Sequence, residues 1–367
     1  MIKELKLFLF ALCLFASFEI SAAPKYKLVD LGLQESDQSE AVAINDNGQV
    51  AGIYWMLGKK YYFMWTEKDG IHLIDLPETA SIKVLNNAGQ IAGDYKDASG
   101  KDRGFIWEAS LGFNDIDTLG GSFTRVYDMN DLGQIVGESE SSNISLVDGR
   151  KEIKAFIWQK SSMIDLGALT GDLGVHGDRS VATSINNQGQ IIGTSNFLIA
   201  HKQKFLRTKN RAVVWQNGVI EEIDRSLHLE CSALATSVNN SGLATFWHST
   251  YGYYAVDLAE KSKILFSINN FNCPFEITDE KDIFIIHTTA DIPAIYISFL
   301  KGANSKEYKF GEIFYDYVYF QDTFQSPTLW KLNAFVGTSF NNKRWVAGVA
   351  ENIYGEHHGV LLVPITE

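Results

Sequence analysis

Five cationic side chains lie close together in an otherwise acidic chain, with no acidic residue among them. Such a run can attract an anionic partner, such as a phosphorylated or acidic glycan, by charge. A solvated surface loop is the plainer alternative, and the sequence favours it. The cationic residues are Lys202, Lys204, Arg207, Lys209 and Arg211.

Three polar residues upstream of this run, His176, Asp178 and Arg179, could add hydrogen-bonding groups to the same site. No candidate nucleophile accompanies them, so the sequence does not support a catalytic site there. The metalloprotease, serine-hydrolase and Cys-x-x-Cys motifs are also missing from the sequence.

The segment Asn-Asp-Asn-Gly at 45–48 looks superficially like part of a calcium loop. Its equivalents later in the chain read Asn-Asn-Ala-Gly and Asn-Asn-Gln-Gly, and calcium coordination needs several carboxylates. We interpret the asparagine as structural, with a side chain that satisfies backbone groups of a turn. We therefore expect neither a metal site nor a cofactor.

This turn belongs to a segment that recurs along the chain. Its anchor residues are 39 to 63 positions apart, a period typical of propellers and solenoids. Apolar residues alternate on both sides of Asn-x-x-Gly, which indicates two strands joined by a hairpin with a left-handed glycine. The copies occupy 43–52, 84–93, 128–137, 184–193, 237–246, 276–285 and 339–348.

A third strand in each copy is indicated by bulky residues at period two, and a short fourth strand follows it. Regular recurrence of these residues favours packing between blades over exposed platforms for sugar stacking. Four short strands per repeat predict an all-β protein, a β-propeller of about seven four-stranded antiparallel blades. The bulky pairs are Phe63–Trp65, Phe105–Trp107, Phe156–Trp158 and Val213–Trp215.

The two ends of the repeat region predict how the ring closes. Residues 25–32 look like a fourth strand without a blade, and residues 359–365 lie where a third strand belongs. Pairing of these segments would remove both exposed sheet edges. The alternative is that 25–32 is only an edge strand on the first blade. Either way, 23–367 is expected to form a single propeller domain.

Residues 1–22 have the pattern of a secretory signal peptide, with a positive start, an apolar run and small residues before Ala23. We expect an exported protein, periplasmic or extracellular, without a transmembrane anchor. In an oxidising compartment Cys231 and Cys273 could form a disulfide, and two unpaired thiols are the alternative.

The net charge of −12 argues against nucleic-acid binding, which needs a basic surface, and favours a soluble monomer. Three long segments, 138–153, 167–179 and 194–210, depart from the regular repeat. We expect them to be enlarged loops that meet on one face of the ring, where functional groups often lie.

The repeats, together with Lys154–Trp158 (KAFIW) and Ile164–Gly167 (IDLG), resemble the HAF family of extracellular repeat proteins. The resemblance is good over about 25–225 and poor over 226–367. It implies a secreted bacterial protein of β-propeller type and supplies no catalytic or binding residues.

Two functions remain open from the sequence. The first is a non-catalytic binding module for an anionic glycan, an envelope component or a protein. The alternative is a glycan hydrolase or lyase with a site at the mouth of the central channel. An enzyme should place carboxylates at the ends of the first strands, where the repeats place asparagine, so we favour the binding module.

Overall fold

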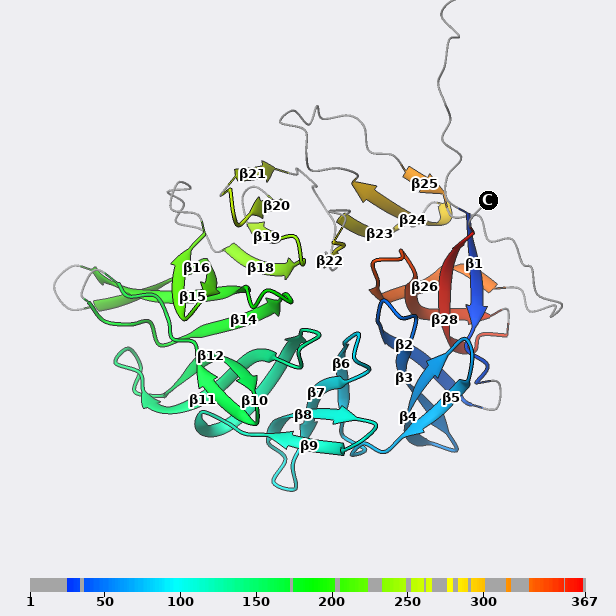
Figure 1. The fold of residues 1–367 in the computed structure, drawn as a ribbon, viewed down its shortest axis with the longest axis horizontal. Coiled ribbons are helices and arrows are strands. Elements are labelled where there is room, and N and C mark those ends of the chain that lie inside the picture. Colours follow the sequence, from blue (N-terminus) through cyan, green and yellow to red (C-terminus); the bar gives the residue numbers. More distant parts are fainter. Residues whose placement is uncertain are drawn as a thin grey trace, which may run out of the picture.

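Seven four-stranded antiparallel sheets are arranged around a central axis in the computed structural model, as a β-propeller (Figure 1). The chain therefore has the fold that its repeats predict. In the described part of the chain, no helix has the length and apolar character needed to cross a bilayer. The structure describes residues 25–33, 36–171, 174–201, 205–223, 233–248, 252–260, 262–265, 276–279, 283–289, 292–300, 315–317, 330–352 and 354–365.

Each sheet is one blade, and in the first six blades the strands follow the chain outward from the axis. The first three blades consist of β2 (Gln38–Ile44), β3 (Val50–Met56), β4 (Lys59–Thr66) and β5 (Gly70–Ile74); β6 (Ser81–Leu85), β7 (Ile91–Lys96), β8 (Asp102–Glu108) and β9 (Gly112–Ile116); and β10 (Gly120–Met129), β11 (Ile135–Ile144), β12 (Lys151–Gln159) and β13 (Ser162–Asp165).

The next three blades repeat this order. They consist of β14 (Ser180–Ile185), β15 (Ile191–His201), β16 (Phe205–Gln216) and β17 (Val219–Glu222); β18 (Ala233–Val238), β19 (Leu243–His248), β20 (Gly252–Asp257) and β21 (Ser262–Leu265); and β22 (Glu276–Ile277), β23 (Ile283–Thr289), β24 (Ile292–Leu300) and β25 (Tyr315–Tyr317).

The seventh blade joins the two ends of the chain. Strand β1 (Lys25–Asp30) pairs antiparallel with β28 (His357–Ile365), with Lys25 opposite Ile365 and Asp30 opposite Val360. Strands β27 (Val346–Asn352) and β26 (Trp330–Phe340) complete this sheet. The predicted closure is therefore confirmed, and the edge-strand alternative on the first blade is excluded.

A glycine near the end of each regular repeat core makes room for an aromatic ring of the third strand. Gly52 lies opposite Phe63, and a Cβ on Gly52 would overlap that ring and the carbonyl oxygen of Glu40. In the fifth blade Phe246 replaces the glycine. Its ring stacks on the opposite aromatic residue, Tyr254, with ring centroids 5.3 Å apart.

The apolar core lies between neighbouring blades. One cluster joins Ala51 and Tyr62 of the first blade to Ile82, Ile91 and Phe105 of the second. A fully buried Phe156 belongs to a similar cluster between the second and third blades. The expectation that the aromatic residues pack blade against blade is confirmed.

The long segments of the third and fourth repeats are mostly hairpins and not loops. Strands β15 and β16 remain paired from Ile191–Trp215 to His201–Phe205, so most of 194–210 is β-ladder. Strands β11 and β12 extend in the same way, to the pair Ile144–Lys151. The loop interpretation was wrong for 138–153 and 194–210, because added residues in a hairpin can satisfy their backbone groups by continuing the ladder, whereas 167–179 connects two strands as a loop.

Candidate binding site at the channel mouth

The first asparagine of a repeat core both closes its own hairpin and holds the next blade, and in the sixth core Thr278 stands in its place. Asn45 Oδ1 accepts hydrogen bonds from the main-chain N–H groups of Asn47 and Gln49 at 3.1 and 3.0 Å. Its Nδ2 donates to the carbonyl oxygen of Asn86 in the next blade at 2.8 Å. The predicted structural role in the turn is confirmed, and the bond between blades is an addition that one repeat cannot reveal.

The residue after this asparagine forms a second set of bonds around the axis. In every blade its main-chain N–H donates to the side-chain Oδ1 of the equivalent residue in the following blade, at 2.7–2.9 Å. The circuit crosses all seven blade junctions. We call these residues the mouth ring: Asp46, Asn87, Asp131, Asn187, Asn240, Asp279 and Asn342.

Carboxylates and amides of the mouth ring are also bonded side chain to side chain. Asn87 Nδ2 donates to Oδ2 of both Asp46 and Asp131 at 3.1 Å. Asn342 Nδ2 likewise bridges Asp46 and Asp279, at 2.9 and 3.1 Å. Three negative charges are thereby held around the axis by amide donors, which fixes the positions of the side chains.

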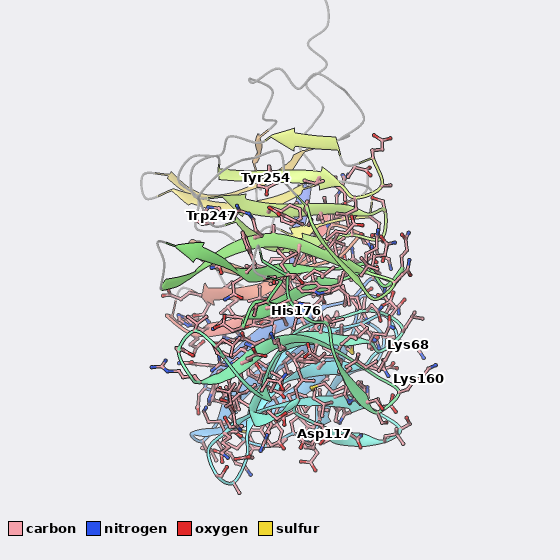
Figure 2. All side chains as sticks on the ribbon, turned by 90° about the vertical axis from the view of Figure 1, so that its left-hand side faces the viewer. Lys68, Asp117, Lys160, His176, Trp247 and Tyr254 are labelled. Atoms are coloured by element: carbon pink, nitrogen blue, oxygen red, sulfur yellow. The ribbon has the colours of Figure 1, made fainter. Side chains whose placement is uncertain are left out.

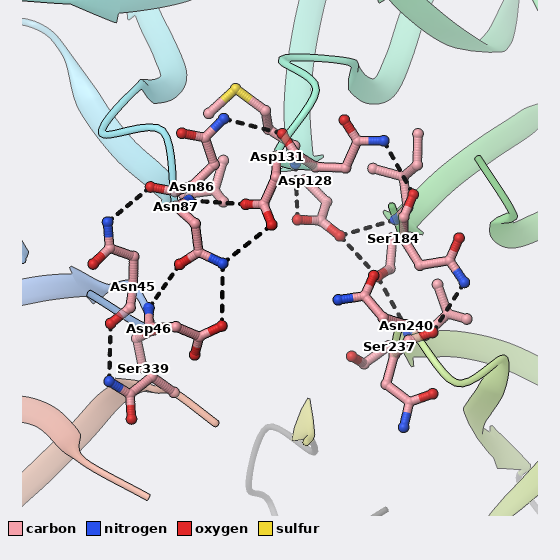
Figure 3. A pocket seen from close by; sticks show the side chains of 18 of the residues that line it. Asn45, Asp46, Asn86, Asn87, Asp128, Asp131, Ser184, Ser237, Asn240 and Ser339 are labelled. Atoms are coloured by element: carbon pink, nitrogen blue, oxygen red, sulfur yellow. Dashed lines mark hydrogen bonds between the residues drawn. The ribbon is translucent and has the colours of Figure 1, made fainter. Parts of the chain in front are cut away.

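The mouth ring borders a cavity of about 330 Å³ on the axis of the propeller. Figure 3 shows its side chains converging from several blades, with Asp128 and Ser184 among them. Asparagine, aspartate, serine and threonine residues provide much of the lining. A cavity that every blade helps to line, with fixed polar groups, has the form of a small-molecule site.

Asp128 is a buried carboxyl group that lines this cavity. Its Oδ2 accepts hydrogen bonds from Ser184 Oγ at 2.7 Å and from the main-chain N–H of Ile185 at 2.9 Å. Burial among protein atoms raises the pKa of Asp128 to about 6, and these hydrogen bonds oppose the rise. The group can therefore exchange a proton near neutral pH.

The first-to-second and third-to-fourth strand hairpins share the face that carries the mouth ring. Lys68 and Lys160 belong to third-to-fourth strand hairpins of different blades and lie at the same edge of the disc (Figure 2). The long β11–β12 and β15–β16 hairpins leave from the opposite strand ends. The predicted basic run and the channel mouth are thus on opposite faces.

The structure brings His176, Asp178 and Arg179 together as structural contacts between the third and fourth blades. Asp178 accepts hydrogen bonds from Ser145 Oγ and Asn196 Nδ2, both at 2.5 Å. Arg179 Nη2 contacts Glu138 Oε2 at 2.9 Å.

The ring of His176 forms a hydrogen bond with the hydroxyl of Thr170 at 2.9 Å. The three residues therefore fix the connection between blades, and none is assembled with a nucleophile.

Only part of the predicted basic patch can be located. Arg211 forms an ion pair with Glu222 at 2.8 Å and lies over the ring of Phe197, so its charge is engaged within the blade. Arg207 and Lys209 lie on β16, opposite Ile199 and Phe197. Lys202 and Lys204 lie outside the described residues, as do Cys231, Cys273 and the expected signal peptide 1–22.

Carboxylates at the channel mouth were missed by the sequence interpretation. We expected asparagine at the first-strand ends, but Asp46, Asp131 and Asp279 follow those positions directly and point to the axis. The available signal was the fourth residue of each core, which is always Asp or Asn. Among the described residues, no three His, Cys, Asp or Glu side chains gather in a way that could hold a metal ion.

Comparisons with known proteins give the fold alone. No protein-family model and no curated protein matches the chain. The propeller domain of the Trilobed protease from Pyrococcus furiosus is similar in structure, with a TM-score of 0.56, 10% identity and coverage of 90% of this chain and 98% of that one.

Two further solved structures are similar at the same level. Pyrococcus horikoshii acylaminoacyl peptidase has a TM-score of 0.50 and 12% identity, with coverage of 91% of this chain and 54% of that one. A puromycin hydrolase has a TM-score of 0.50 and 13% identity, with 92% and 56% covered. The chain spans little more than half the length of these two enzymes. It belongs to the class of β-propeller proteins, and these likenesses carry no activity over to it.

Proposed function

We propose that this chain is an exported, non-catalytic binding protein that holds a small ligand at the mouth of its propeller channel. The observation that supports it best is the mouth ring around a cavity of about 330 Å³. Its polar groups are fixed by bonds to one another before any ligand arrives, and a preorganised site loses less entropy on binding.

The hydrogen bonds that the carboxylates of the mouth ring already accept also favour binding over catalysis. Asp46 accepts three amide hydrogen bonds, from Asn87 Nδ2 and from the main-chain and side-chain nitrogens of Asn342. A carboxylate held in this way is a hydrogen-bond acceptor fixed in position. Three of the four acidic groups at the mouth are held like this.

Equilibrium dialysis against a cell-envelope extract tests the proposal. The mature chain, residues 23–367, should retain a small molecule that mass spectrometry recovers with its mass unchanged. Ser237→Trp should abolish retention, because Ser237 lines the cavity and an indole there would fill it. Ser81→Trp is the matched control, since Ser81 is exposed at the start of β6. Equal retention by both variants would refute the channel mouth as the site.

A glycan hydrolase or lyase is the second candidate, and Asp128 is the observation that favours it. A carboxyl group with a pKa of about 6 in a cavity is suited to general acid catalysis. The same dialysis experiment distinguishes a binding protein from an enzyme, because an enzyme would release fragments of lower mass. Loss of those fragments in Asp128→Asn would then assign the role to that residue.

Contact of the basic run with an anionic glycan or envelope component stays a separate prediction. Its test is a glycan array probed with the protein in which Lys202, Lys204, Arg207, Lys209 and Arg211 are replaced by serine. Unchanged hits would remove the run as a binding site.

A further inference from the structure

An odd number of blades leaves the mouth ring with one irregular junction. Carboxylate and amide can alternate perfectly only around an even ring, so two like residues must be neighbours. Those neighbours are Asn187 and Asn240, joined by the main-chain N–H of Asn187 and Oδ1 of Asn240 at 2.8 Å.

Each of these two asparagines retains an amide hydrogen without a ring partner. Asn187 Nδ2 donates to Asp131 Oδ2 at 2.7 Å, and Asn240 Nδ2 donates to Asp279 Oδ2 at 3.0 Å. An amide nitrogen has two hydrogens, and neither Nδ2 has a second acceptor among the described residues. Asn87 differs, because its two hydrogens are both used.

The carboxylates of the mouth ring have free hydrogen-bond acceptor positions. Asp131 accepts bonds from the main-chain nitrogen and Nδ2 of Asn87 and from Nδ2 of Asn187. A carboxylate has about four acceptor positions, so roughly one remains free on each aspartate of the ring. The mouth ring itself therefore offers two donors at one junction and single acceptors around the rest of the rim, while Lys83, Ser237 and Ser339 line the cavity beside it.

This distribution selects among classes of ligand. An ammonium group only donates and would leave the two amides unmatched, and a ligand carboxylate only accepts and would meet three like charges. A hydroxyl group donates and accepts, so it satisfies both sets. The cavity of about 330 Å³ is at the small end of ligand pockets, which start at roughly 300 Å³.

We infer that the channel mouth binds a neutral polyhydroxylated ligand, such as a single sugar unit, oriented by the free amide hydrogens of Asn187 and Asn240. This inference rests on the proposed binding function and names its ligand class. The amides donate to hydroxyl oxygens of the ligand, and ligand hydroxyls donate to the free positions of Asp46, Asp131 and Asp279.

Isothermal titration of the mature chain with related sugars tests this inference. Four neutral probes are glucose, galactose, mannose and N-acetylglucosamine, and the charged comparisons are glucosamine and glucuronate. At least one neutral probe should bind, and more tightly than both charged sugars. Tighter binding of glucosamine or glucuronate, or no binding of any neutral probe, would overturn the inference.

Two variants locate the contact. Asn240→Ala should weaken the best neutral probe by roughly 5-fold or more, the usual effect of one lost hydrogen bond. Asn87→Ala removes ring bonds but no free amide hydrogen, and should weaken it less. Equal effects would refute the role of the irregular junction. If Asn240→Ala fails to fold, the inference is still tested by Asn187→Ala and by the order in which the wild-type protein binds the neutral and charged sugars.

Failure of this inference is distinguishable from failure of the proposed function. A ligand retained from envelope extract and lost in Ser237→Trp would support a binding site at the mouth even if no neutral sugar bound. In that case the ligand class alone would be wrong.

Discussion

The main-chain N–H of Asn342 donates to Oδ1 of Asp46 at 2.8 Å, although the two residues are 296 positions apart in the chain. Beside this bond, Asn341 Nδ2 donates to the carbonyl oxygen of Asn45, also at 2.8 Å. The last repeat is therefore locked to the first by the same two bonds that connect the other regular repeats. Blade seven both completes its sheet with β1 and completes the mouth ring.

Removal of the Asn341 side chain should destabilise the whole propeller. Asn341 is buried, and Asn341→Ala would remove the acceptor of the N–H groups of Lys343 and Trp345 and one of the two donors to Asn45 O. We expect a loss of roughly 1–3 kcal/mol in the free energy of unfolding, measured by urea denaturation. Lys343→Ala, at an exposed neighbour, should cost less than about 0.5 kcal/mol. Similar losses in the two variants would contradict the closing role of Asn341.

Two glycines of the fourth repeat should respond differently to alanine. Gly189 has a positive φ of 75° and open space around it. Gly189→Ala should therefore cost only the free energy of placing alanine in the left-handed conformation, about 1–2 kcal/mol. A Cβ on Gly193 would overlap the carbonyl oxygen of Val181 and approach Trp215 to 2.9 Å. Gly193→Ala should therefore lower Tm much more, and a smaller drop than for Gly189→Ala would show that the ring of Trp215 does not need this space.

Asp128 should give the protein a pH-dependent stability. Its folded pKa of about 6 lies above the unfolded value of about 3.9, so the folded state binds more protons between these values. Its stabilising contribution is present below pH of about 3.9 and is lost as pH rises through about 6.

Asp128→Asn removes this dependence, so the stability of the variant relative to wild type should rise by roughly 2 kcal/mol from pH 4 to pH 7.5. Asp94, whose pKa burial also raises to about 6, is unchanged in both proteins and cancels from the comparison. Melting curves across this pH range provide the measurement. A constant difference between the two proteins would mean that Asp128 is ionised as easily in the fold as in the unfolded chain.

Export is predicted from the first residues of the chain. Mass spectrometry of the mature protein should find its N-terminus at or near Ala23, because the small residues before it form the expected cleavage site. Recovery of the protein only from the cytosol, with Met1 intact, would contradict export.

The repeats predict much of the fold because each copy carries its own local signals. Gly48 adopts the left-handed conformation expected of its hairpin, with φ of 79°, and Phe63 is buried at the predicted face of its strand. These properties depend on neighbours within one blade. The closing strand was also predictable from local signals, because residues 25–32 look like a fourth strand and residues 359–365 look like a third strand.

The mouth ring was not predicted because its bonds join residues of different repeats. Asp46 and Asn87 look like ordinary turn residues in isolation, and only the blade geometry aims the N–H of one at the side chain of the other. The long hairpin β15–β16 was misjudged for a related reason, since its composition suits a solvated loop but its backbone continues the ladder.

The most direct test of the mouth ring as a ligand site is an X-ray structure of the mature chain with its best neutral sugar, at about 1.2 Å or better so that amide orientations can be assigned. We predict ligand hydroxyls within hydrogen-bond distance of Nδ2 of both Asn187 and Asn240, with the seven main-chain bonds of the ring intact. A ligand bound away from this junction, or a ring opened between Asp46 and Asn342, would contradict the account.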